Sequence, residues 1–345
     1  MGPPLPRPMR ASVLFHPGKA EVLRYVEVAD PKPGPGEVLV RVKGTSVNRL
    51  DMWIRQGTYR VPLPHILGTD IVGEVVAESP SGRWKEGARV VVYPGVPCRK
   101  CPACRSGHES LCPTLGIVGR ERHGGYAELV SLPEENLFPL PDRVDWKEAS
   151  AFPLTYLTAE HALNRAGTVG GETVLVLGAS GGVGCAAIAR AHRRGARVLA
   201  VTGSPQHVPA LRVLGAEEVL MRGSNDLVER VQALTRGRGA DVVIDPVGSA
   251  MWMTGLKSLA RGGRYVLVGV TSGAEATTEL RVIYTRQLSV LGGFLGDRGE
   301  FGTLVEELSR GRISPTVSEA LPLGRAAEAH QMMDAPHLGK FVLVP

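Results

Sequence analysis

Hydrophobic and polar positions follow different patterns in the two parts of this chain. Residues 10–30 alternate between apolar and polar side chains, which is typical of strands with one buried face. From Thr173 onward, short runs of Val, Leu and Ile alternate with longer amphipathic stretches. Such runs predict strands buried on both faces, with helices between them. We therefore expect an α/β protein that combines a β-rich domain with a doubly wound parallel sheet.

The bounds of the expected elements follow from these patterns and from the glycines and prolines that interrupt them. In the first part, strands are expected within 10–30 and at 38–42, 67–76, 87–92, 124–130 and 137–140, with helical stretches within 46–59 and 146–166. In the parallel sheet, strands are expected at 173–178, 197–202, 217–221, 241–245, 263–268 and 288–293, with helices near 183–194, 206–214, 225–235 and 250–261. After these, helices near 301–310 and 324–333 precede a final strand that returns to the first domain.

The stretch Val174–Gly184, VLVLGASGGVG, is the strongest signal for a ligand. A buried strand runs into a turn that contains Gly178, Gly181 and Gly184, and then into a helix. Glycines allow a dinucleotide pyrophosphate to approach the backbone, and the helix N-terminus offers free N–H groups and a partial positive charge. The spacing G-x-x-G-x-x-G departs from the G-x-G-x-x-G fingerprint, so a plain tight turn is the alternative.

Four cysteines form a second cluster with an informative spacing. Cys98, Cys101, Cys104 and Cys112 follow the pattern C-x2-C-x2-C-x7-C. Four thiolates complete the tetrahedral shell of a zinc ion and leave no position for water or substrate, so the pattern predicts a structural zinc lobe at about 95–115. Two disulfides are the alternative, which is disfavoured in a cytosolic enzyme. Cys185 lies outside this set and is expected to be a small buried residue.

Length, composition and charge limit the classes of function. A chain of 345 residues with 43% hydrophobic residues corresponds to about two packed domains. The net charge of +6 is diffuse, which suits an anionic ligand such as a dinucleotide or an acyl-CoA and does not indicate nucleic-acid binding. No apolar run is long enough to span a membrane, and the leader MGPPLPRPMR lacks the apolar core of a signal peptide. We therefore expect a cytoplasmic protein with a small-molecule substrate and no nucleic-acid or membrane partner.

A set of motifs makes the chain resemble the medium-chain dehydrogenase/reductase superfamily. They are the cysteine lobe, GTDIVGEV, GGYAELV, FPLTYLTA, GASGGVG, DVVIDPVG, LVGVTSG and GKFVLV, and together they extend over nearly all residues after Met9. The resemblance implies a GroES-like, β-rich catalytic domain formed by 1–154 and 295–345, and a Rossmann dinucleotide-binding domain formed by 155–294. It also implies a homodimer, or a dimer of dimers, joined through the strand near 288–293.

The chain departs from this family pattern at the positions of the catalytic zinc ligands. Zinc alcohol dehydrogenases of the superfamily hold that zinc on a Cys, a His–Glu pair and a later Cys. The corresponding residues here are Asn48, Thr69, Asp70 and Leu154, which do not make a zinc site, and His65 alone does not replace them. The chain therefore resembles a mixed type that keeps the structural zinc and lacks the catalytic zinc. The stretches SVNRLDMWIRQGTY and GASGGVG are similar to the quinone oxidoreductase and enoyl-thioester reductase branches.

The loss of a catalytic zinc changes the expected reaction. Without a Lewis acid, an alkoxide that forms from an alcohol loses its main stabilisation. A polarised C=C bond needs less help, because the enolate that follows hydride addition is stabilised by hydrogen-bond donors. We therefore expect NAD(P)H-dependent reduction of an enoyl thioester such as an enoyl-CoA, or of an enone or quinone. An alcohol dehydrogenase of the same superfamily and a non-catalytic NAD(P)H-binding protein are the alternatives.

The resemblance also supplies candidate residues on the substrate side. Tyr59, in QGTY, matches the position of the catalytic tyrosine of enoyl-thioester reductases and is expected to donate a hydrogen bond or proton, unless water supplies the proton. Asn48 is expected to hold the cofactor or the substrate carbonyl, or else to cap a turn. Trp53 and Leu154 are expected to line the substrate pocket, with a core position as the alternative for Trp53.

Residues at the end of the second strand of the parallel sheet contact the adenosine ribose and so distinguish NADH from NADPH. Thr202 and the segment GSPQHVP provide neither a carboxylate to repel a 2′-phosphate nor a Lys or Arg to bind one. Arg222 is a candidate for that contact, although a solvated surface charge is the favoured interpretation. NADH is therefore slightly favoured and NADPH stays open. The cofactor contacts that the resemblance implies are Thr155, Gly181, Gly182, Val183, Thr202, Val247, Val270, Phe294 and Lys340, of which Lys340 has a surface lysine as its alternative.

Overall fold

The computed structural model describes residues 8–224 and 226–345 and separates the chain into two compact units. Residues 1–7 of the leader and Asn225, at the start of one expected helix, lie outside the described residues, whereas Met9 and Arg10 of the leader belong to the first strand. The first change of unit follows Leu154, and the second follows Glu300 rather than residue 294, because the Glu300 carboxylate bonds to His161 and Asn164. Unit 1 holds the residues up to Leu154, Phe301–Ala335 and Lys340–Pro345; unit 2 holds Thr155–Glu300 and Pro336–Gly339.

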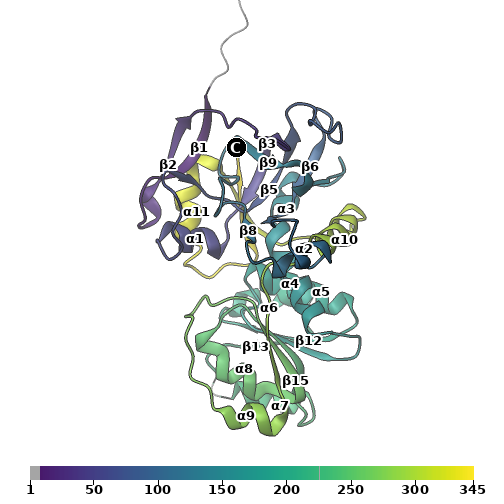
Figure 1. Ribbon diagram of the computed structural model, residues 1–345. Helices are drawn as coiled ribbons and strands as arrows, with labels where there is room; N and C mark the ends of the chain where they lie inside the picture. Colours follow the sequence, from purple (N-terminus) through teal and green to yellow (C-terminus); the bar gives the residue numbers. More distant parts are fainter. Residues whose placement is uncertain (1–7, 225) are drawn as a thin grey trace, which may run out of the picture. The chain divides into compact units, whose positions relative to one another are not determined.

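Unit 1 is built mainly from antiparallel strands (Figure 1). A small sheet has the order β2-β1-β4, and a larger sheet has the order β10-β6-β5-β3-β18-β17, with β9 also paired to β3. A two-stranded ribbon, β7-β8, flanks the cysteine lobe. The strands are β1 (Met9–Leu14), β2 (Leu23–Val28), β3 (Glu37–Ser46), β4 (His65–Ile66), β5 (Asp70–Val75), β6 (Arg89–Val92), β7 (Gly95–Val96), β8 (Gly116–Ile117), β9 (Leu129–Pro133), β10 (Leu137–Pro139), β17 (Val317–Pro322) and β18 (Lys340–Val344).

The helices near these strands are short. They are α1 (Arg49–Arg55), α2 (Pro102–Arg105), α3 (Trp146–Ser150) and α11 (Ala326–Met332), while α4 (Pro153–Arg165) and α10 (Arg298–Ser309) begin in one unit and end in the other. Short 3-10 helices occupy Ala20–Val22, Glu109–Leu111, Glu134–Asn136, Pro205–His207, Ser249–Met251 and Leu323–Arg325.

Two expectations for unit 1 were wrong in detail. The strand expected at 124–130 begins only at Leu129, because the preceding glycines form a tightly packed turn. A Cβ at Gly124 would lie 2.2 Å from the carbonyl oxygen of Gly68, which leaves no room for any other residue. The strand β17 was not expected, because its sequence VSEALP is half-exposed and lacks an apolar run. It is recognisable only through its parallel pairing with β18.

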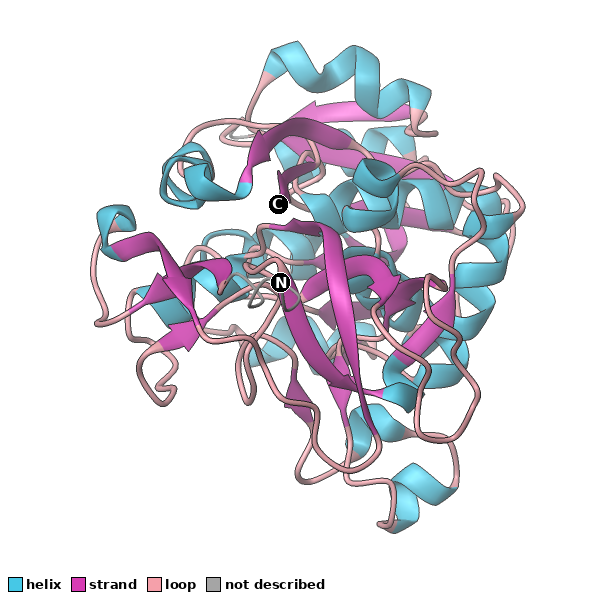
Figure 2. Ribbon diagram, turned by 90° about the horizontal axis from the view of Figure 1, so that it is seen from above, coloured by secondary structure: helices cyan, strands magenta, loops and turns pink. Residues whose placement is uncertain are grey.

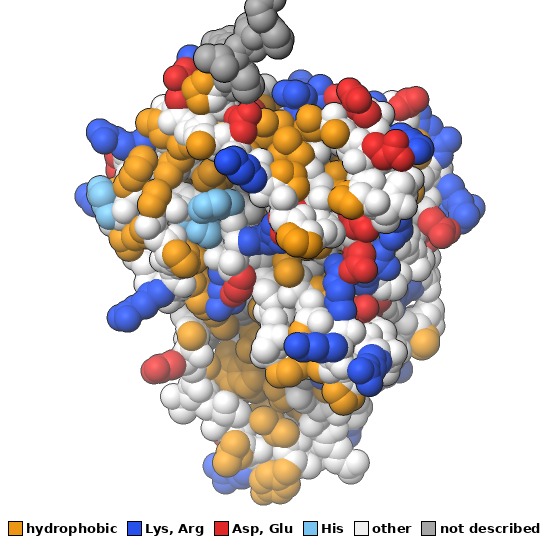
Figure 3. All heavy atoms as spheres, turned by 45° about the horizontal axis from the view of Figure 1, so that its top comes forward, with side chains coloured by type: hydrophobic (Ala, Val, Ile, Leu, Met, Phe, Trp, Pro, Cys, Tyr) orange, Lys and Arg blue, Asp and Glu red, His pale blue; other side chains and the backbone are white. Residues whose placement is uncertain are grey.

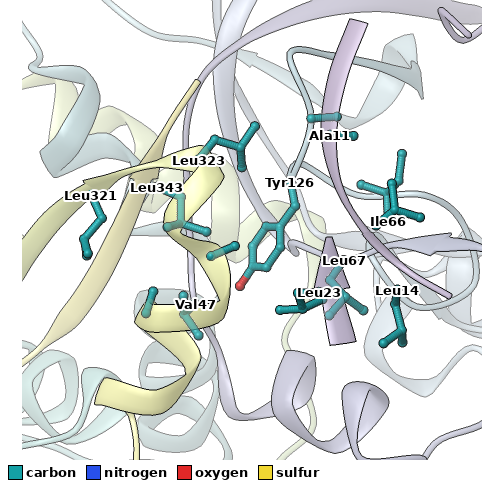
Figure 4. Packing of buried hydrophobic residues seen from close by; sticks show 14 of the residues in the cluster. Ala11, Leu14, Leu23, Val47, Ile66, Leu67, Tyr126, Leu321, Leu323 and Leu343 are labelled. Carbon is teal, nitrogen blue, oxygen red and sulfur yellow. The ribbon is translucent and has the colours of Figure 1, made fainter. Parts of the chain in front are cut away.

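Tyr126 lies at the centre of a buried apolar cluster in unit 1. Figure 4 shows its ring between Val47 on one side and Leu23 and Leu67 on the other. Its hydroxyl is 3.1 Å from Nε2 of His330. Burial raises the pKa of Tyr126 well above its usual value and lowers the pKa of His330 to about 3, so both side chains are neutral inside this core.

Unit 2 contains the predicted parallel sheet, in the order β13-β12-β11-β14-β15-β16. Every neighbouring pair of its strands is parallel, so the carboxyl ends of all strands share one edge, and helices lie on both faces (Figure 1). The strands are β11 (Thr173–Val176), β12 (Arg197–Thr202), β13 (Glu218–Met221), β14 (Ala240–Asp245), β15 (Leu259–Leu267) and β16 (Ser289–Gly292). The helices are α5 (Gly182–Arg193), α6 (Val208–Val213), α7 (Leu227–Leu234), α8 (Trp252–Ser258) and α9 (Leu280–Arg286).

Loops and turns connect these elements over long stretches (Figure 2), in keeping with 43 glycines and 26 prolines. Basic and acidic side chains are interspersed on the face shown in Figure 3, as expected from a small and diffuse net charge. No helix among the described residues combines the length and the apolar character needed to cross a lipid bilayer.

Candidate functional site

The glycine turn after β11 leads directly into α5, whose N-cap is Gly181. Two of its glycines are required by the turn itself: a Cβ at Gly178 would lie 2.9 Å from Cγ2 of Val247, and one at Gly184 would lie 2.4 Å from the oxygen of Gly178. Gly181 differs, because a Cβ there would meet only one protein atom, at an ordinary 3.5 Å. The open side of Gly181 and the first N–H groups of α5 are therefore the part of the turn that is left for a phosphate group.

The candidate cofactor residues of unit 2 gather along the carboxyl edge of the parallel sheet. Gly181, Gly182 and Val183 follow β11, Thr202 ends β12, Val247 follows β14, Val270 follows β15 and Phe294 follows β16. Thr155 belongs to α4 and is buried. Phe294 is 52% exposed, so its ring is available to a ligand. Their contacts with a nicotinamide cofactor stay predictions.

Asp245 holds the turn that carries Val247, and sequence reasoning did not single it out. Its buried carboxylate accepts hydrogen bonds from the N–H groups of Val247 at 2.6 Å and Gly248 at 3.1 Å, and from the hydroxyl of Tyr265 at 2.5 Å. Burial raises the pKa of Asp245, although these three donors act in the opposite direction. The motif DVVIDPVG could have indicated this role, because an Asp that precedes Pro and Gly often accepts hydrogen bonds from the backbone of a turn.

Arg222 lies beside the end of β12, where adenosine ribose is recognised in such sheets. Its N–H donates to the oxygen of Thr202 at 2.7 Å, and its guanidinium packs against Gly203, where a Cβ would be 3.0 Å from Nη2. The side chain forms no ion pair with another described residue. Arg222 is exposed, as the interpretation of a surface charge expects, and its guanidinium lies next to Gly203.

In unit 1, buried polar groups converge on the carboxylate of Asp70 at the start of β5. Its Oδ2 accepts hydrogen bonds from Oγ of Ser46 at 2.6 Å and Nδ2 of Asn48 at 2.8 Å, and its Oδ1 accepts from the backbone N–H of Leu154 at 2.8 Å. Asp70 is completely buried. Asp70 stands at one of the four positions that correspond to catalytic zinc ligands in zinc alcohol dehydrogenases, and two of the other three, Asn48 and Leu154, contact its carboxylate.

The cation of this cluster is Lys340, the first residue of β18. Its ammonium group lies 3.0 Å from Oδ2 of Asp70 and also donates to Oδ1 of Asn48. Only 4% of Lys340 is exposed, so the alternative of a surface lysine was wrong. The preceding Gly339 belongs to unit 2, where its N–H donates to the oxygen of Ser180 in the glycine turn at 2.8 Å.

Asp51 forms a second layer behind Asn48. Its carboxyl group accepts hydrogen bonds from the N–H of Asn48 at 2.8 Å, which closes a capping box on α1, and from the N–H of Gly68 at 3.0 Å. Asn48 therefore caps a helix, which was the alternative considered for it, and it also contacts Asp70; its role in holding the cofactor or the substrate carbonyl stays a prediction. Burial raises the pKa of Asp51 to about 7, with Asp70 adding to the rise and the two N–H groups and Lys340 opposing it.

The two aromatic candidates of α1 and the following loop lie together. The rings of Trp53 and Tyr59 meet edge to face at 6.1 Å between centroids, and both are half-buried. The guanidinium carbon of Arg120 lies 4.6 Å from the centre of the Tyr59 ring, a cation–π distance. The sequence patterns did not single out Arg120.

Asp70 belongs to no cluster of metal-binding side chains. Among the residues that the structure describes, only two groups bring together three or more His, Cys, Asp or Glu ligand atoms, and neither includes position 48, 69, 70 or 154. Asn48, Thr69 and Leu154 offer no thiolate or imidazole, and His65 is engaged through Nε2 with the oxygen of Gly119 at 3.1 Å. The donor set at these positions therefore does not fit a catalytic zinc ion.

The predicted cysteine lobe does fit a zinc ion. The four ligand atoms of Cys98, Cys101, Cys104 and Cys112 all lie within 4.8 Å of one another, and Sγ of Cys98 and Cys104 are 3.9 Å apart. Zinc bound tetrahedrally at about 2.3 Å separates its sulfur ligands by about 3.8 Å. Backbone N–H groups of Lys100 and Cys101 lower the pKa of Cys98, whereas burial and the neighbouring thiols raise the pKa of Cys104, so the fit to zinc rests on the geometry of the four sulfurs.

The second cluster consists of His161, Asp297 and Glu300 in unit 2. The Glu300 carboxylate accepts from Nδ1 of His161 at 2.9 Å, from Asn164 at 2.6 Å and from the N–H of Asp297 at 2.8 Å. The last bond joins the residue before α10 to its third residue, as in a capping box. These bonds attach the first turn of α10 to α4, so a structural role accounts for the cluster.

Comparison with known proteins agrees with this architecture. The family model of the alcohol dehydrogenase GroES-like domain matches residues 34–142, and that of zinc-binding dehydrogenases matches residues 182–310. The chain is 32% identical to a quinone oxidoreductase of Rattus norvegicus, over 97% of this chain and 98% of that protein. It is also 32% identical to an acryloyl-coenzyme A reductase of Metallosphaera sedula, over 92% and 95% of the two chains.

Solved structures give the same result. The crystal structure of an NAD-dependent alcohol dehydrogenase superposes with a TM-score of 0.94 at 40% identity, covering 98% of this chain and 100% of that chain. The predicted fold class, a GroES-like β-rich domain with a Rossmann parallel sheet, is confirmed.

The raised pKa of Asp51 predicts a pH-dependent contribution to stability. The folded protein holds this proton more tightly than the unfolded chain, whose pKa is near 3.8. The stabilisation is therefore complete below about pH 4 and is lost as the pH rises through about 7. An Asp51→Asn variant lacks this titration, so its deficit in Tm relative to the wild type should narrow with rising pH, by roughly 3 °C per unit between pH 5 and 7.

Calorimetry of both proteins at pH 5, 6, 7 and 8 measures this difference. Because His330 and the other titrating groups are present in both proteins, their contributions cancel in the comparison. A deficit that widens as the pH rises would contradict the prediction.

The cysteine lobe predicts one zinc ion per chain, measured by elemental analysis of the purified protein. A Cys112→Ser variant should lose most of this zinc and melt at a lower temperature, because the metal ties four separate points of the lobe together. The matched control is Cys185→Ser, a buried cysteine outside the lobe, which should keep the full zinc content. Full zinc in Cys112→Ser, or two zinc ions per wild-type chain, would contradict the prediction.

Proposed function

The chain belongs to the medium-chain dehydrogenase/reductase superfamily, whose similar members are oxidoreductases. On this premise we propose that it is an NAD(P)H-dependent reductase of a polarised C=C bond, in an enoyl thioester such as an enoyl-CoA or in an enone or quinone. Two relatives are named for quinone and acryloyl-CoA substrates, which supports this class of acceptor.

The observation that carries the proposal is the environment of Asp70. Its two oxygens are occupied by the hydroxyl of Ser46, the amide of Asn48, the N–H of Leu154 and the ammonium of Lys340. Oδ2 accepts three of these bonds and Oδ1 accepts one, so most of the acceptor capacity of the carboxylate is already used by donors of the protein itself. The chemistry therefore relies on hydrogen-bond donors, which suit an enolate oxygen better than an alkoxide.

The reaction needs a hydride, a proton and stabilisation of one oxygen. A nicotinamide cofactor, whose phosphates Gly181, Gly182 and Val183 would help to hold, would supply the hydride for the β-carbon of the substrate and so convert the C=C bond and its carbonyl into an enolate. The amide N–H of Asn48 binds the carbonyl oxygen on which the negative charge collects. The hydroxyl of Tyr59 then delivers a proton to the α-carbon, either itself or through a water molecule, and Trp53 and Arg120 hold its ring.

A second candidate is an alcohol or aldehyde dehydrogenase. The observation in its favour is the 40% identity to an NAD-dependent alcohol dehydrogenase, over 98% of this chain and 100% of that chain. The same assay panel separates the two candidates, because it includes aldehydes.

Arg222 favours NADPH over the slight preference for NADH that the sequence suggested. Its guanidinium packs against Gly203, at the end of β12, and forms no ion pair with a described carboxylate. Guanidinium groups bind phosphate in a two-point geometry, so this position suits a 2′-phosphate on the adenosine ribose.

We also propose the homodimer that the family resemblance implies. β16 is an edge strand of the parallel sheet, and its Val290 is 44% exposed. An exposed edge with an apolar side chain is a surface on which the same strand of a second copy can pair.

The proposed reaction predicts oxidation of NADPH or NADH in the presence of short enoyl-CoAs, enones or quinones. Cofactor absorbance measures it against a panel that also contains aldehydes. A Tyr59→Phe variant keeps the ring but loses the hydroxyl, so its kcat should fall by roughly 10- to 100-fold. The control, Tyr25→Phe, changes a tyrosine of β2 and should keep the wild-type kcat.

Turnover on aldehydes alone would contradict the proposed function and favour the alcohol dehydrogenase. Full activity of Tyr59→Phe on a C=C substrate would support the proposed reaction but contradict a role of the Tyr59 hydroxyl in it.

The position of Arg222 predicts the cofactor preference. In Arg222→Gln, the KM for NADPH should rise by roughly 10-fold or more, while the KM for NADH should stay within about twofold, because only NADPH carries the 2′-phosphate. Arg212→Gln is the matched control, since Arg212 lies on α6 and pairs with Glu218. Equal effects of Arg222→Gln on both cofactors would contradict this role.

A further inference from the structure

Two charged neighbours determine the orientation of the Asn48 side chain. Nδ2 of Asn48 donates to the carboxylate of Asp70 at 2.8 Å, and Oδ1 accepts from the ammonium of Lys340. The two ends of an amide have nearly the same shape but opposite hydrogen-bonding roles. With an anion at one end and a cation at the other, only one orientation of the amide satisfies both neighbours.

Lys340 is the group on which this arrangement depends most. It is buried, and its pair with Asp70 is the only ion pair of that carboxylate among the described residues. The other donors to Asp70 are neutral: the hydroxyl of Ser46, the amide of Asn48 and the N–H of Leu154. Without the ammonium, Asp70 would be a buried charge with no counter-ion, and Oδ1 of Asn48 would lose its charged donor and keep only the backbone N–H of Asp51 in the capping box.

The orientation leaves one N–H of Asn48 available. The amide has two N–H bonds, and one is directed to Asp70; the described residues provide no acceptor for the other. A buried N–H without a partner is costly, unless a ligand supplies an acceptor. A carbonyl oxygen is an acceptor of the required kind. If the amide were reversed, Oδ1 would stand where this N–H now is and would repel a carbonyl or enolate oxygen.

We propose that Lys340 is a positioning residue, which holds the Asn48 amide so that its second N–H binds the carbonyl oxygen of the substrate. The proposal rests on the proposed function, and it assigns to Lys340 a role different from the cofactor contact that the family resemblance implies. It limits the substrate to compounds whose C=C bond is conjugated to a carbonyl group, such as thioesters, ketones and quinones.

The kinetic test compares Lys340→Met with Lys43→Met, which removes a half-exposed lysine paired with Glu74. In Lys340→Met, the kcat on a substrate that the wild type reduces should fall by roughly 10- to 100-fold, while the Kd of NADPH and NADH, measured by fluorescence, stays within about twofold. Lys43→Met should match the wild type. A large rise in Kd with kcat retained would overturn the proposal and establish the cofactor contact instead.

A double variant separates positioning from folding. Lys340→Met leaves a buried charge and should lower Tm by roughly 10 °C, whereas Lys340→Met with Asp70→Asn removes both charges and should regain much of that loss. If Lys340 positions Asn48, the double variant stays slow although it is stable. Recovery of kcat together with Tm would show a purely structural role and overturn the proposal.

The amide can also be observed without any substrate. The chain has four asparagines, Asn48, Asn136, Asn164 and Asn225, so protein labelled with ¹⁵N-asparagine gives few side-chain NMR signals. The Asn48 pair is identified by its loss in Asn48→Asp. It should shift in Lys340→Met and stay unchanged in Lys43→Met; an unchanged pair in Lys340→Met overturns the proposal.

These readouts distinguish failure of the inference from failure of the proposed function. A wild-type protein that reduces no C=C substrate contradicts the function, while a shifted Asn48 signal in Lys340→Met still supports positioning of the amide. A wild-type protein that does reduce them, combined with an unshifted signal and unchanged kcat in Lys340→Met, contradicts the inference alone.

Discussion

The buried ion pair between Asp70 and Lys340 is the interaction on which the candidate site of unit 1 depends. It joins the start of β5 to the start of β18, and through Asp70 it also fixes Asn48 and the N–H of Leu154. Removing one member of a buried pair leaves an uncompensated charge, which costs far more than the pair contributes when intact. The cluster is therefore a unit whose members hold one another in place.

The parallel sheet of unit 2 provides the second constraint. Because all its strands run in the same direction, the loops that follow the strands all lie at the carboxyl edge of the sheet. Close packing explains two of the three glycines in the first of these loops, and Asp245 fixes another loop through two backbone N–H groups. Packing within the protein does not require a glycine at position 181, because a Cβ there would meet only one atom at an ordinary distance. A bound ligand that approaches the backbone would require it.

The parts of the site that could be predicted from sequence are local motifs. The cysteine spacing and the glycine turn each lie within a short stretch, where residue type and spacing are informative together. The partner of Lys340 could not be predicted, because Asp70 lies 270 positions away and a single lysine carries no spacing signal. The stacking of Arg120 on Tyr59 was missed for the same reason. The strand β17 could not be predicted either, because its composition is not typical of a strand and only its pairing with β18 identifies it.

The exposure of Arg222 has an evolutionary consequence. It lies at the surface and packs against a glycine, so its replacement leaves no buried group without a partner. Surface changes of this kind usually alter stability little. Under the role proposed for Arg222, cofactor preference can change by a single substitution, whereas a change at Asp70, Asn48 or Lys340 requires compensating changes in the same cluster. A change of cofactor would thus need fewer coordinated substitutions than a change in the residues proposed to bind the substrate.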